Sequence, residues 1–207
     1  MVAIIDYEAG NLTSVRRAFE YLGIPAKITR DKQEIKKAER VVFPGVGQAG
    51  AAMESLKKYS LDIVLKEVIQ AETPVLGICL GCQIILDFSQ ENQTPCLKIM
   101  PGRVYRLALS SINRELKIPH MGWNTLVAQQ SHSLLKNIDP EERFYFVHEY
   151  YPKPDNKNNI IALTEYGLEF PSFIANKNLA AMQFHPEKSG RPGLQILQNF
   201  ASWAGKD

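Results

Sequence analysis

The chain has 207 residues, a length that suits a single domain able to bury a full core without disulfide or metal staples. Hydrophobic residues make up 45% of the chain and charged residues 22%, which excludes disordered, collagen-like and coiled-coil proteins. The net charge of +2 gives no field that would favour a nucleic acid or an anionic membrane as partner, and no apolar run is long enough to span a bilayer.

The first half of the chain alternates short apolar runs with amphipathic stretches. Val2 to Ile5 is predicted as a buried strand, and the apolar spacing from Leu12 to Leu22 predicts a helix. Further strands are expected at residues 26–29, 40–43 and 74–78, and further helices at 49–57 and 61–71. Strands that alternate with helices indicate crossover connections and a parallel sheet covered on both faces.

The second half contains short strand candidates with turn residues between them. They are expected at residues 103–109, 124–128, 143–148, 160–165, 172–176 and 179–184. Because no long helices separate them, they predict an antiparallel portion. Polar loops are expected at 90–95 and 152–159, and a final helix from about Pro192 to Trp203. We therefore predict one domain over residues 1–207, a three-layer α/β/α fold with a mostly parallel central sheet and antiparallel additions in the second half.

The strongest chemical signal lies between Pro74 and Gln83. An apolar strand runs directly into Gly-Ile-Cys79-Leu80-Gly, which has the spacing of the G-x-S-x-G nucleophile elbow with cysteine in place of serine. The helix that follows presents its positive end to the sulfur, which lowers the pKa of a thiol, and the Leu80 amide is placed to stabilise an oxyanion. Two alternatives are a buried structural cysteine and a C-x-x-C redox pair of Cys79 with Cys82. A zinc site is not expected, since no second pair of ligands has metal-binding spacing.

A nucleophilic thiol needs a base, and that base needs an orienting group. His185 directly follows an apolar strand, and Pro186 keeps its backbone extended. In an extended chain, residues two apart face the same side, so Glu187 is expected to accept a hydrogen bond from the His185 ring. The Pro44-Gly-Val-Gly47 segment follows another strand, and its backbone amides are a second candidate for an oxyanion donor.

These motifs together resemble the class I (triad) glutamine amidotransferases. In that family the cysteine attacks the side-chain amide of glutamine, releases ammonia and leaves a thioester that water hydrolyses. Further segments resemble the glutaminase subunits of imidazole glycerol phosphate synthase: Ile4-Ile-Asp-Tyr-x-x-Gly-Asn-Leu12, Pro119-His-Met-Gly-Trp-Asn124, Tyr145-Phe-Val-His-x-Tyr150 and His185-Pro-Glu-Lys-Ser189.

The resemblance assigns a role to each residue of the site. It implies that Cys79 is the nucleophile, that His185 is the general base and then the acid, and that Glu187 orients His185. It also implies that the amides of Gly47 and Leu80 form the oxyanion hole once the loop of residues 44–47 rearranges. The substrate-binding residues that it implies are Gln83, Glu91, Glu149 and Tyr150. No cofactor and no metal are expected.

The resemblance further implies a heterodimer with a (β/α)₈ cyclase subunit. That partner would use the ammonia to make imidazole glycerol phosphate and an aminoimidazole carboxamide ribonucleotide in histidine biosynthesis. The implied partner-facing residues are His120, Met121, Trp123, Asn124 and Lys188. We expect neither a nucleic-acid nor a membrane partner. The cysteines are odd in number, and two of them lie only three residues apart, which disfavours a secreted disulfide framework. Together with an N-terminus that has no positive region, this indicates a cytoplasmic protein.

Some residues depart from the pattern of the family. Cys82 stands where methionine is usual, Gln90 where an acidic residue is common, and Glu149 where a smaller residue is typical; the last change could alter the affinity for glutamine. These differences are also compatible with an alternative, a paralogue that supplies ammonia to another cyclase-like partner in sugar or surface-polysaccharide biosynthesis. An anthranilate-synthase-type glutaminase is disfavoured by the segments 44–47 and 123–124, and a non-catalytic scaffold by the presence of all triad residues.

Overall fold

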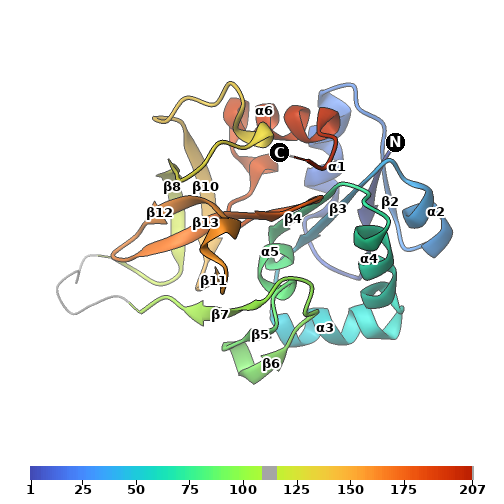
Figure 1. The fold of residues 1–207 in the computed structure, drawn as a ribbon, viewed down its shortest axis with the longest axis horizontal. Coiled ribbons are helices and arrows are strands. Elements are labelled where there is room, and N and C mark those ends of the chain that lie inside the picture. The colour runs from blue at the N-terminus through green and yellow to red at the C-terminus, as the bar shows by residue number, and fades with distance from the viewer. Residues whose placement is uncertain (109–115, 207) are drawn as a thin grey trace.

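A computed structural model describes residues 1–108 and 116–206, so Leu109, the expected end of one strand, lies outside the described part. Its largest sheet has eight strands in the order β2-β1-β3-β4-β14-β13-β12-β9 (Figure 1). The parallel strands are β2 (Ala26–Thr29), β1 (Val2–Ile5), β3 (Arg40–Gly45), β4 (Val75–Cys79) and β14 (Leu179–Met182). The antiparallel strands are β13 (Glu169–Asn176), β12 (Ile160–Glu165) and β9 (Val127–Ala128). The predicted combination of a parallel sheet with antiparallel additions is therefore confirmed.

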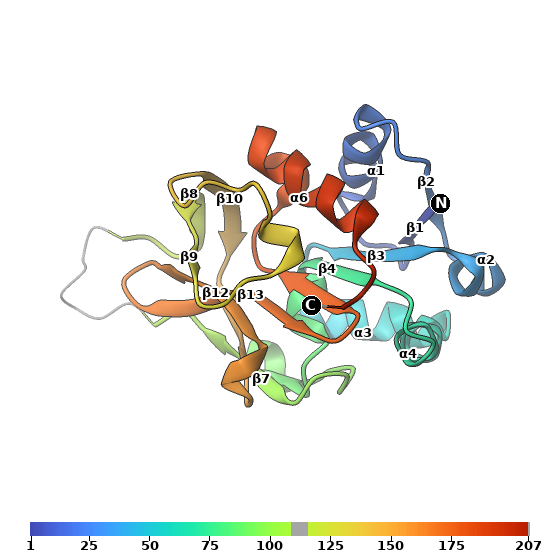
Figure 2. The same cartoon turned by 45° about the horizontal axis from the view of Figure 1, so that its top comes forward.

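Helices cover both faces of the parallel strands (Figures 1 and 2). One face carries α1 (Leu12–Tyr21) and α6 (Gly190–Ser202), and the other carries α2 (Lys32–Lys37), α3 (Ala49–Lys58), α4 (Leu61–Gln70) and α5 (Leu80–Ile84). Strand β1 illustrates why. Its side chains alternate, so that Val2 and Ile4 pack in one apolar core while Ala3 and Ile5 pack in the other. This arrangement confirms the predicted three layers.

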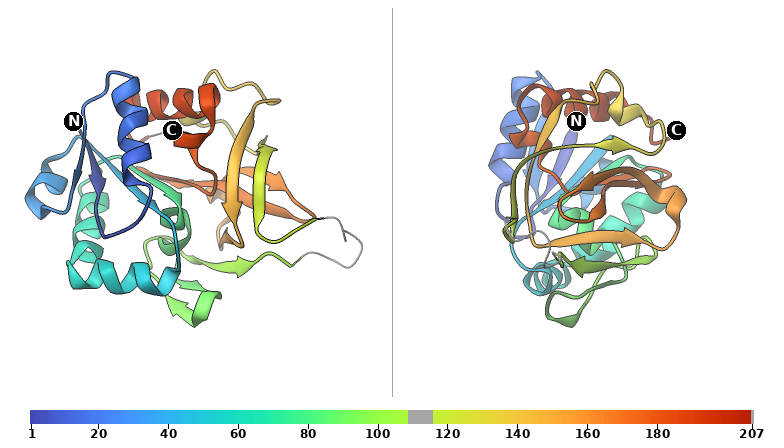
Figure 3. Two further views of the ribbon diagram at one scale, coloured as in Figure 1. Left: turned by 180° about the vertical axis from the view of Figure 1, so that it is seen from behind. Right: turned by 90° about the vertical axis from the view of Figure 1, so that its left-hand side faces the viewer.

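Two smaller sheets complete the second half. β8 (His120–Thr125) pairs antiparallel with β10 (Arg143–His148), and Figure 3 shows this pair beside the antiparallel end of the large sheet. The other sheet has the order β11 (Tyr150–Pro154), β7 (Gly102–Arg106), β5 (Phe88–Ser89) and β6 (Thr94–Pro95). Short 3₁₀ turns are η1 (Glu91–Gln93), η2 (Ser133–Leu135), η3 (Lys157–Asn159) and η4 (Pro186–Lys188).

The structure corrects several expected boundaries. Residues 152–154, expected in a polar loop, belong to β11, which accommodates two prolines because it is an edge strand of its sheet. The unassigned charged segment 31–39 contains α2, which begins where the Asp31 side chain accepts hydrogen bonds from two backbone amides. The expected strand 124–128 is split between β8 and β9. Within the described ranges, no helix is both long and apolar enough to cross a membrane.

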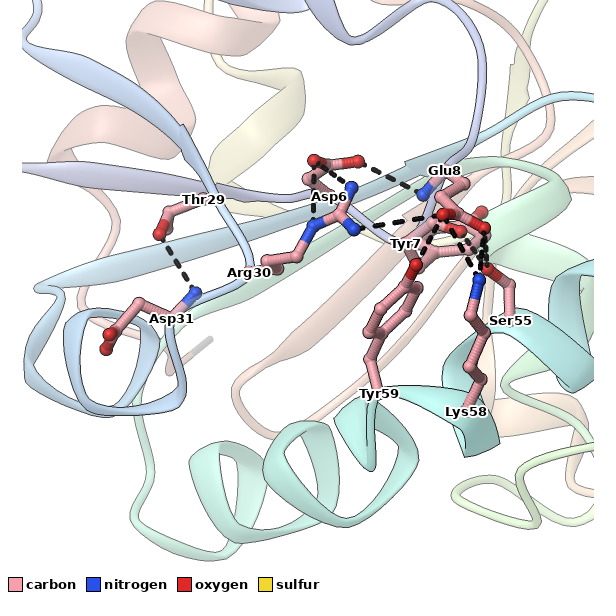
Figure 4. Close-up of polar contacts among 9 residues, drawn as sticks. All are labelled: Asp6, Tyr7, Glu8, Thr29, Arg30, Asp31, Ser55, Lys58 and Tyr59. Carbon is pink, nitrogen blue, oxygen red and sulfur yellow. Dashed lines mark hydrogen bonds and ion pairs between the residues drawn. The ribbon is translucent and has the colours of Figure 1, made fainter.

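A polar network fixes the loop that follows β1 (Figure 4). Glu8 has a left-handed φ of 68° and accepts hydrogen bonds from the Tyr59 hydroxyl and from Lys58, at the end of α3. Asp6 accepts a 2.6 Å hydrogen bond from Arg30, whose guanidinium also lies 4.5 Å from the centre of the Tyr59 ring. These contacts hold the loop against α3 at the carboxyl edge of the parallel strands.

Candidate active site

The turn between β4 and α5 places Cys79 in a strained backbone conformation. Its φ is 53° and its ψ is −107°, a region that residues other than glycine rarely adopt. The turn is also crowded, because a Cβ atom at Gly81 would lie 1.9 Å from the Phe43 carbonyl oxygen. At Gly77 a Cβ atom would lie 3.0 Å from that of Ala181. Of the two positions that the elbow spacing reserves for small residues, Gly81 has no room for a Cβ atom and Gly77 has little.

Cys79 lies at a cavity of about 520 Å³. The predicted oxyanion and substrate residues all contribute to its lining: Gly47, Leu80, Gln83, Glu91, Glu149 and Tyr150. They come from the loop after β3, the start of α5, the turn η1 and the connection between β10 and β11. The fold thus brings together at one cavity groups that are distant in the sequence, while their roles in binding and catalysis remain predictions.

His185 and Glu187 form a buried pair behind the nucleophile. The His185 Nδ1 atom lies 2.7 Å from Glu187 Oε1, and the two side chains are 1% and 0% exposed. Burial alone would lower the pKa of His185, but the negative charge and hydrogen bonding of Cys79, followed by those of Glu187, raise this pKa to about 10. The physical consequence is a protonated imidazole beside the cysteine, the arrangement that activates a cysteine nucleophile.

The local path of the chain at this pair differs from the expected one. His185 is extended, with φ −103° and ψ 94°, as its proline neighbour predicted. The chain then enters η4, so Glu187 reaches the ring from a 3₁₀ turn and not from the same side of a strand. Helix α6 packs closely on this turn, since a Cβ atom at Gly193 would lie 1.9 Å from the Pro186 carbonyl oxygen.

Asn11 is a neighbour of the triad that sequence reasoning missed. Its side-chain amide donates a short hydrogen bond to the same Glu187 oxygen that accepts from His185. A carboxylate held by two donors is fixed in orientation, so Asn11 supports the position of the His185 ring. Its position in the sequence could have indicated this role, because Asn11 follows β1 at the carboxyl edge of a parallel sheet, where the functional sites of such folds lie.

The predicted substrate residues have definite partners. Gln83 is 5% exposed, and its Nε2 donates a 2.8 Å hydrogen bond to the Tyr150 carbonyl oxygen. One carboxylate oxygen of Glu91 accepts a 2.6 Å hydrogen bond from the Ala49 amide at the start of α3. The Glu149 carboxylate, in contrast, is 43% exposed and lies 3.5 Å from the guanidinium of Arg106.

Two further histidines form a chain beside the cavity. His120 Nδ1 lies 3.0 Å from His148 Nε2, and His148 Nδ1 lies 2.9 Å from the Tyr150 carbonyl oxygen. Burial lowers the pKa of His148 to about 3 and that of His120 to about 4, so both rings are neutral. His120 was expected to face a partner protein, but it is 2% exposed and stacks on Tyr166, so its side chain is not offered to the surface.

Other residues expected at a partner surface are exposed. Met121 and Trp123 are 61% and 53% exposed, and as alternate residues of β8 they face the same side. The Trp123 ring lies 5.9 Å from that of Tyr145, over which the ammonium of exposed Lys188 lies at 6.0 Å. Asn124 is half-buried and donates a 2.7 Å hydrogen bond to the Glu165 carbonyl oxygen.

The cysteines do not support a redox pair. All are unpaired and buried, and Cys79 and Cys82 pack in different core clusters. Burial raises the pKa of the Cys82 thiol well above its ordinary value, which makes this thiol unreactive. In residues 1–108 and 116–206, no group of three or more His, Cys, Asp or Glu side chains is arranged to hold a metal ion.

Comparison with known proteins connects this site to a family. Residues 3–203 match the model of the family described as glutamine amidotransferase class-I. The chain is 52% identical to the imidazole glycerol phosphate synthase subunit HisH of Maridesulfovibrio salexigens, over 97% of this chain and 95% of that protein. It is 44% identical to the subunit of the same name from Dehalococcoides mccartyi, over 99% and 98% of the two chains.

Solved structures agree on the fold. PurLQS from Thermotoga maritima aligns with a TM-score of 0.73 at 15% identity, covering 97% of each chain. A glutamine amidotransferase from Thermotoga maritima aligns with a TM-score of 0.66 at 16% identity, covering 97% of this chain and 82% of its own. The protein therefore belongs to the class-I glutamine amidotransferases and, within them, to the HisH subunits of imidazole glycerol phosphate synthase.

Proposed function

We propose that residues 1–207 form one amidotransferase domain that hydrolyses glutamine in the cytoplasm and passes the ammonia to a (β/α)₈ cyclase subunit. Cys79 lies on the elbow, at the wall of the cavity, and the buried His185–Glu187 pair lies behind it. This arrangement is the observation that carries the proposal. Identity of 52% to HisH proteins over nearly the whole chain favours histidine biosynthesis over a paralogous pathway.

Acylation begins with the thiolate of Cys79. Its sulfur attacks the side-chain carbonyl carbon of glutamine, a C–S bond forms, and the electron pair moves to the carbonyl oxygen. As the negative charge leaves the sulfur, His185 loses the charge that raises its pKa most. His185 can then give its Nε2 proton to the departing nitrogen, the C–N bond breaks, and ammonia leaves with a thioester on Cys79.

Deacylation uses the same residues, but His185 now acts as a base and not as an acid. His185, now neutral, accepts a proton from water while the oxygen of that water attacks the thioester carbon. The C–S bond breaks, glutamate is released, and the thiolate–imidazolium pair is restored. Throughout the cycle Glu187 holds the Nδ1 side of the ring, so that Nε2 is directed to the reacting atoms.

The oxyanion that forms in both steps would receive hydrogen bonds from the amides of Leu80 and Gly47. Leu80 is the first residue of α5, and Gly47 lies on the cavity with a left-handed φ of 100°. We propose that the segment of residues 44–47, the end of β3 and the two residues after it, turns its Gly47 amide toward the oxyanion only when the partner binds. This coupling would prevent the release of ammonia without an acceptor.

The other lining residues would bind the substrate. Gln83 and Glu91 would bind polar groups of glutamine, and the backbone at Glu149 and Tyr150 would hold its amino-acid end. The Glu149 side chain points at Arg106 in an exposed ion pair, which leaves its backbone as the part suited to this role. The same exposed position favours a modest effect of this side chain on glutamine affinity.

The surface formed by Met121, Trp123, Tyr145 and Lys188 would bind the cyclase subunit. Exposed aromatic and methionine side chains are typical anchors of protein interfaces. Lys188 is the last residue of η4, the turn that bears Glu187 and directly follows His185, so a partner on this surface would contact the edge of the active site. Asn124 and the buried His120 would support the surface from beneath.

A substitution of the nucleophile tests the proposal in the complex with the cyclase subunit. Cys79→Ala should abolish synthesis that depends on glutamine and preserve synthesis supplied with ammonium salt. Cys82→Ala is the matched control, because it removes a buried thiol from α5, the helix that directly follows Cys79, and Cys82 does not line the cavity; it should retain both activities. Glutamine-dependent synthesis by Cys79→Ala would refute the assignment of the nucleophile.

Partner dependence needs a separate measurement. The isolated chain should release little glutamate from glutamine, and addition of the cyclase subunit with its nucleotide ligand should raise the rate. High and equal turnover with and without the partner would contradict the proposed control by the segment of residues 44–47.

A further inference from the structure

Gln183 is a fully buried amide between the nucleophile and a substrate residue. It follows β14 directly, and its side chain is completely shielded from solvent. Its Nε2 lies 3.7 Å from the Cys79 sulfur, and its Oε1 accepts a 3.0 Å hydrogen bond from Gln83 Nε2. Because a buried amide without partners is costly, an interior glutamine indicates a demand for those two contacts.

The hydrogen bonds determine which end of this amide faces the sulfur. Gln83 Nε2 donates to the Tyr150 carbonyl oxygen as well as to Gln183, and a primary amide nitrogen has only two hydrogens. The group of Gln183 that faces Gln83 must therefore be its oxygen. Its NH₂ group then faces Cys79, where it can donate to the thiolate but not accept from a thiol.

We infer that Gln183 is a further catalytic residue, which holds the Cys79 thiolate through its amide NH₂ and fixes Gln83 through its amide oxygen. This inference rests on the proposed function, in which Cys79 attacks glutamine. It also specifies how Gln83 takes part: with both Nε2 hydrogens engaged, Gln83 presents the substrate with an acceptor, its Oε1. The matching group on the substrate is an N–H donor, either the side-chain amide or the ammonium of glutamine.

Because Gln183 makes two hydrogen bonds, variants that remove both or only one should differ in KM, kcat and thiolate absorbance. Gln183→Met keeps the shape and removes both bonds, so the ultraviolet absorbance of the thiolate should fall and KM for glutamine should rise by about tenfold, or about 1.4 kcal/mol. Gln183→Glu, measured at alkaline pH, still accepts from Gln83 but directs a carboxylate at the sulfur. It should keep KM within about threefold of the wild type and lower kcat by at least about tenfold.

A buried amide elsewhere supplies the control. Asn178 is 4% exposed and donates to the carbonyl oxygens of Ile69, near the end of α4, and Thr73, in the loop that precedes β4. Asn178→Leu should lower the urea midpoint and leave KM and the thiolate absorbance at wild-type values. If Gln183→Met changes only the urea midpoint, as Asn178→Leu does, the inference is refuted.

A double substitution keeps the inference testable if one variant folds poorly. Should Gln83 and Gln183 act as a unit, the loss of kcat/KM in Gln83→Met/Gln183→Met should be much smaller than the product of the losses in the two single variants. Losses that simply multiply would refute the linkage. The Cys79→Ala experiment separates the two levels: retained glutamine activity there overturns the proposed function, whereas wild-type behaviour of the Gln183 variants overturns only this inference.

Discussion

Crowding at the elbow predicts that Gly81→Ala will damage both folding and catalysis. The added Cβ atom would lie 1.9 Å from the Phe43 carbonyl oxygen, about 1.5 Å inside the 3.4 Å at which ordinary contact begins. The backbone fixes the position of the Cβ atom, and the Phe43 oxygen is itself a backbone atom, so no side-chain rotation relieves the clash. Phe43 belongs to β3, which ends at Gly45, two residues before the proposed oxyanion donor Gly47, and a shift therefore moves Cys79 away from that donor.

The magnitudes follow from the size of that shift. Overpacking of this kind destabilises a protein by about 1–3 kcal/mol, and a displacement of about 1 Å at reacting groups lowers kcat about a hundredfold. Urea unfolding measures the first effect. Glutamine-dependent synthesis in the complex measures the second, with ammonium-dependent synthesis as the reference that should not change.

Gly50→Ala is the control for the same chemical change. A Cβ atom there would lie 3.6 Å from Thr94 Oγ1, an ordinary contact, and helix propensity favours alanine by up to about 1 kcal/mol. Its stability should be equal to or above that of the wild type, with full activity. Wild-type stability and kcat in Gly81→Ala would show that close packing against β3 does not position the nucleophile.

Further predictions concern the triad, the buried histidines and the surface. Glu187→Gln should lower glutamine-dependent kcat at least about a hundredfold, because it removes a negative charge that helps to raise the pKa of His185; a kcat within a few-fold of the wild type would contradict this. His148 has a folded-state pKa of about 3, below the ordinary value of 6.5, so its contribution to stability is complete above pH 6.5 and declines as the pH falls. The stability gap between the wild type and His148→Gln should therefore narrow by about 1 kcal/mol between pH 7 and 5.5 in urea titrations, and a constant gap would refute a neutral buried ring. Trp123→Ala should weaken binding to the cyclase subunit by about 2 kcal/mol in calorimetric titration, and unchanged affinity would exclude it as an anchor. Glu149→Ala should change KM for glutamine less than about fivefold, since an exposed ion pair contributes at most about 1 kcal/mol; a larger change would give this side chain a direct binding role.

The fold could be predicted from the sequence where burial alone decides the structure. β1 and β2 match their expected bounds, because strands of a covered parallel sheet sit in continuous apolar or alternating runs. β11 could not be found in this way. Its two prolines and its lysine read as loop, and only pairing with β7 makes the segment a strand.

In the site, likewise, local sequence predicts some residues, and only the tertiary structure reveals others. The elbow around Cys79 and the pairing of His185 with Glu187 follow from residues a few positions apart. Asn11 and Gln183 act on partners that are 176 and 104 positions away in the chain, so no local spacing could indicate them. The one clue to Gln183 is that it is a single polar residue in an apolar run. Such a residue needs hydrogen-bond partners, but the sequence does not indicate which residues they are.

The left-handed backbone at Cys79 sets a limit for protein engineering. A residue other than glycine costs about 1–3 kcal/mol in such a conformation, and glycine removes that penalty. Directed evolution for heat resistance alone would thus favour glycine at position 79 and yield a more stable protein without a nucleophile. Selection for turnover keeps the less stable residue in place, so thermostable and active forms must gain their stability at other positions.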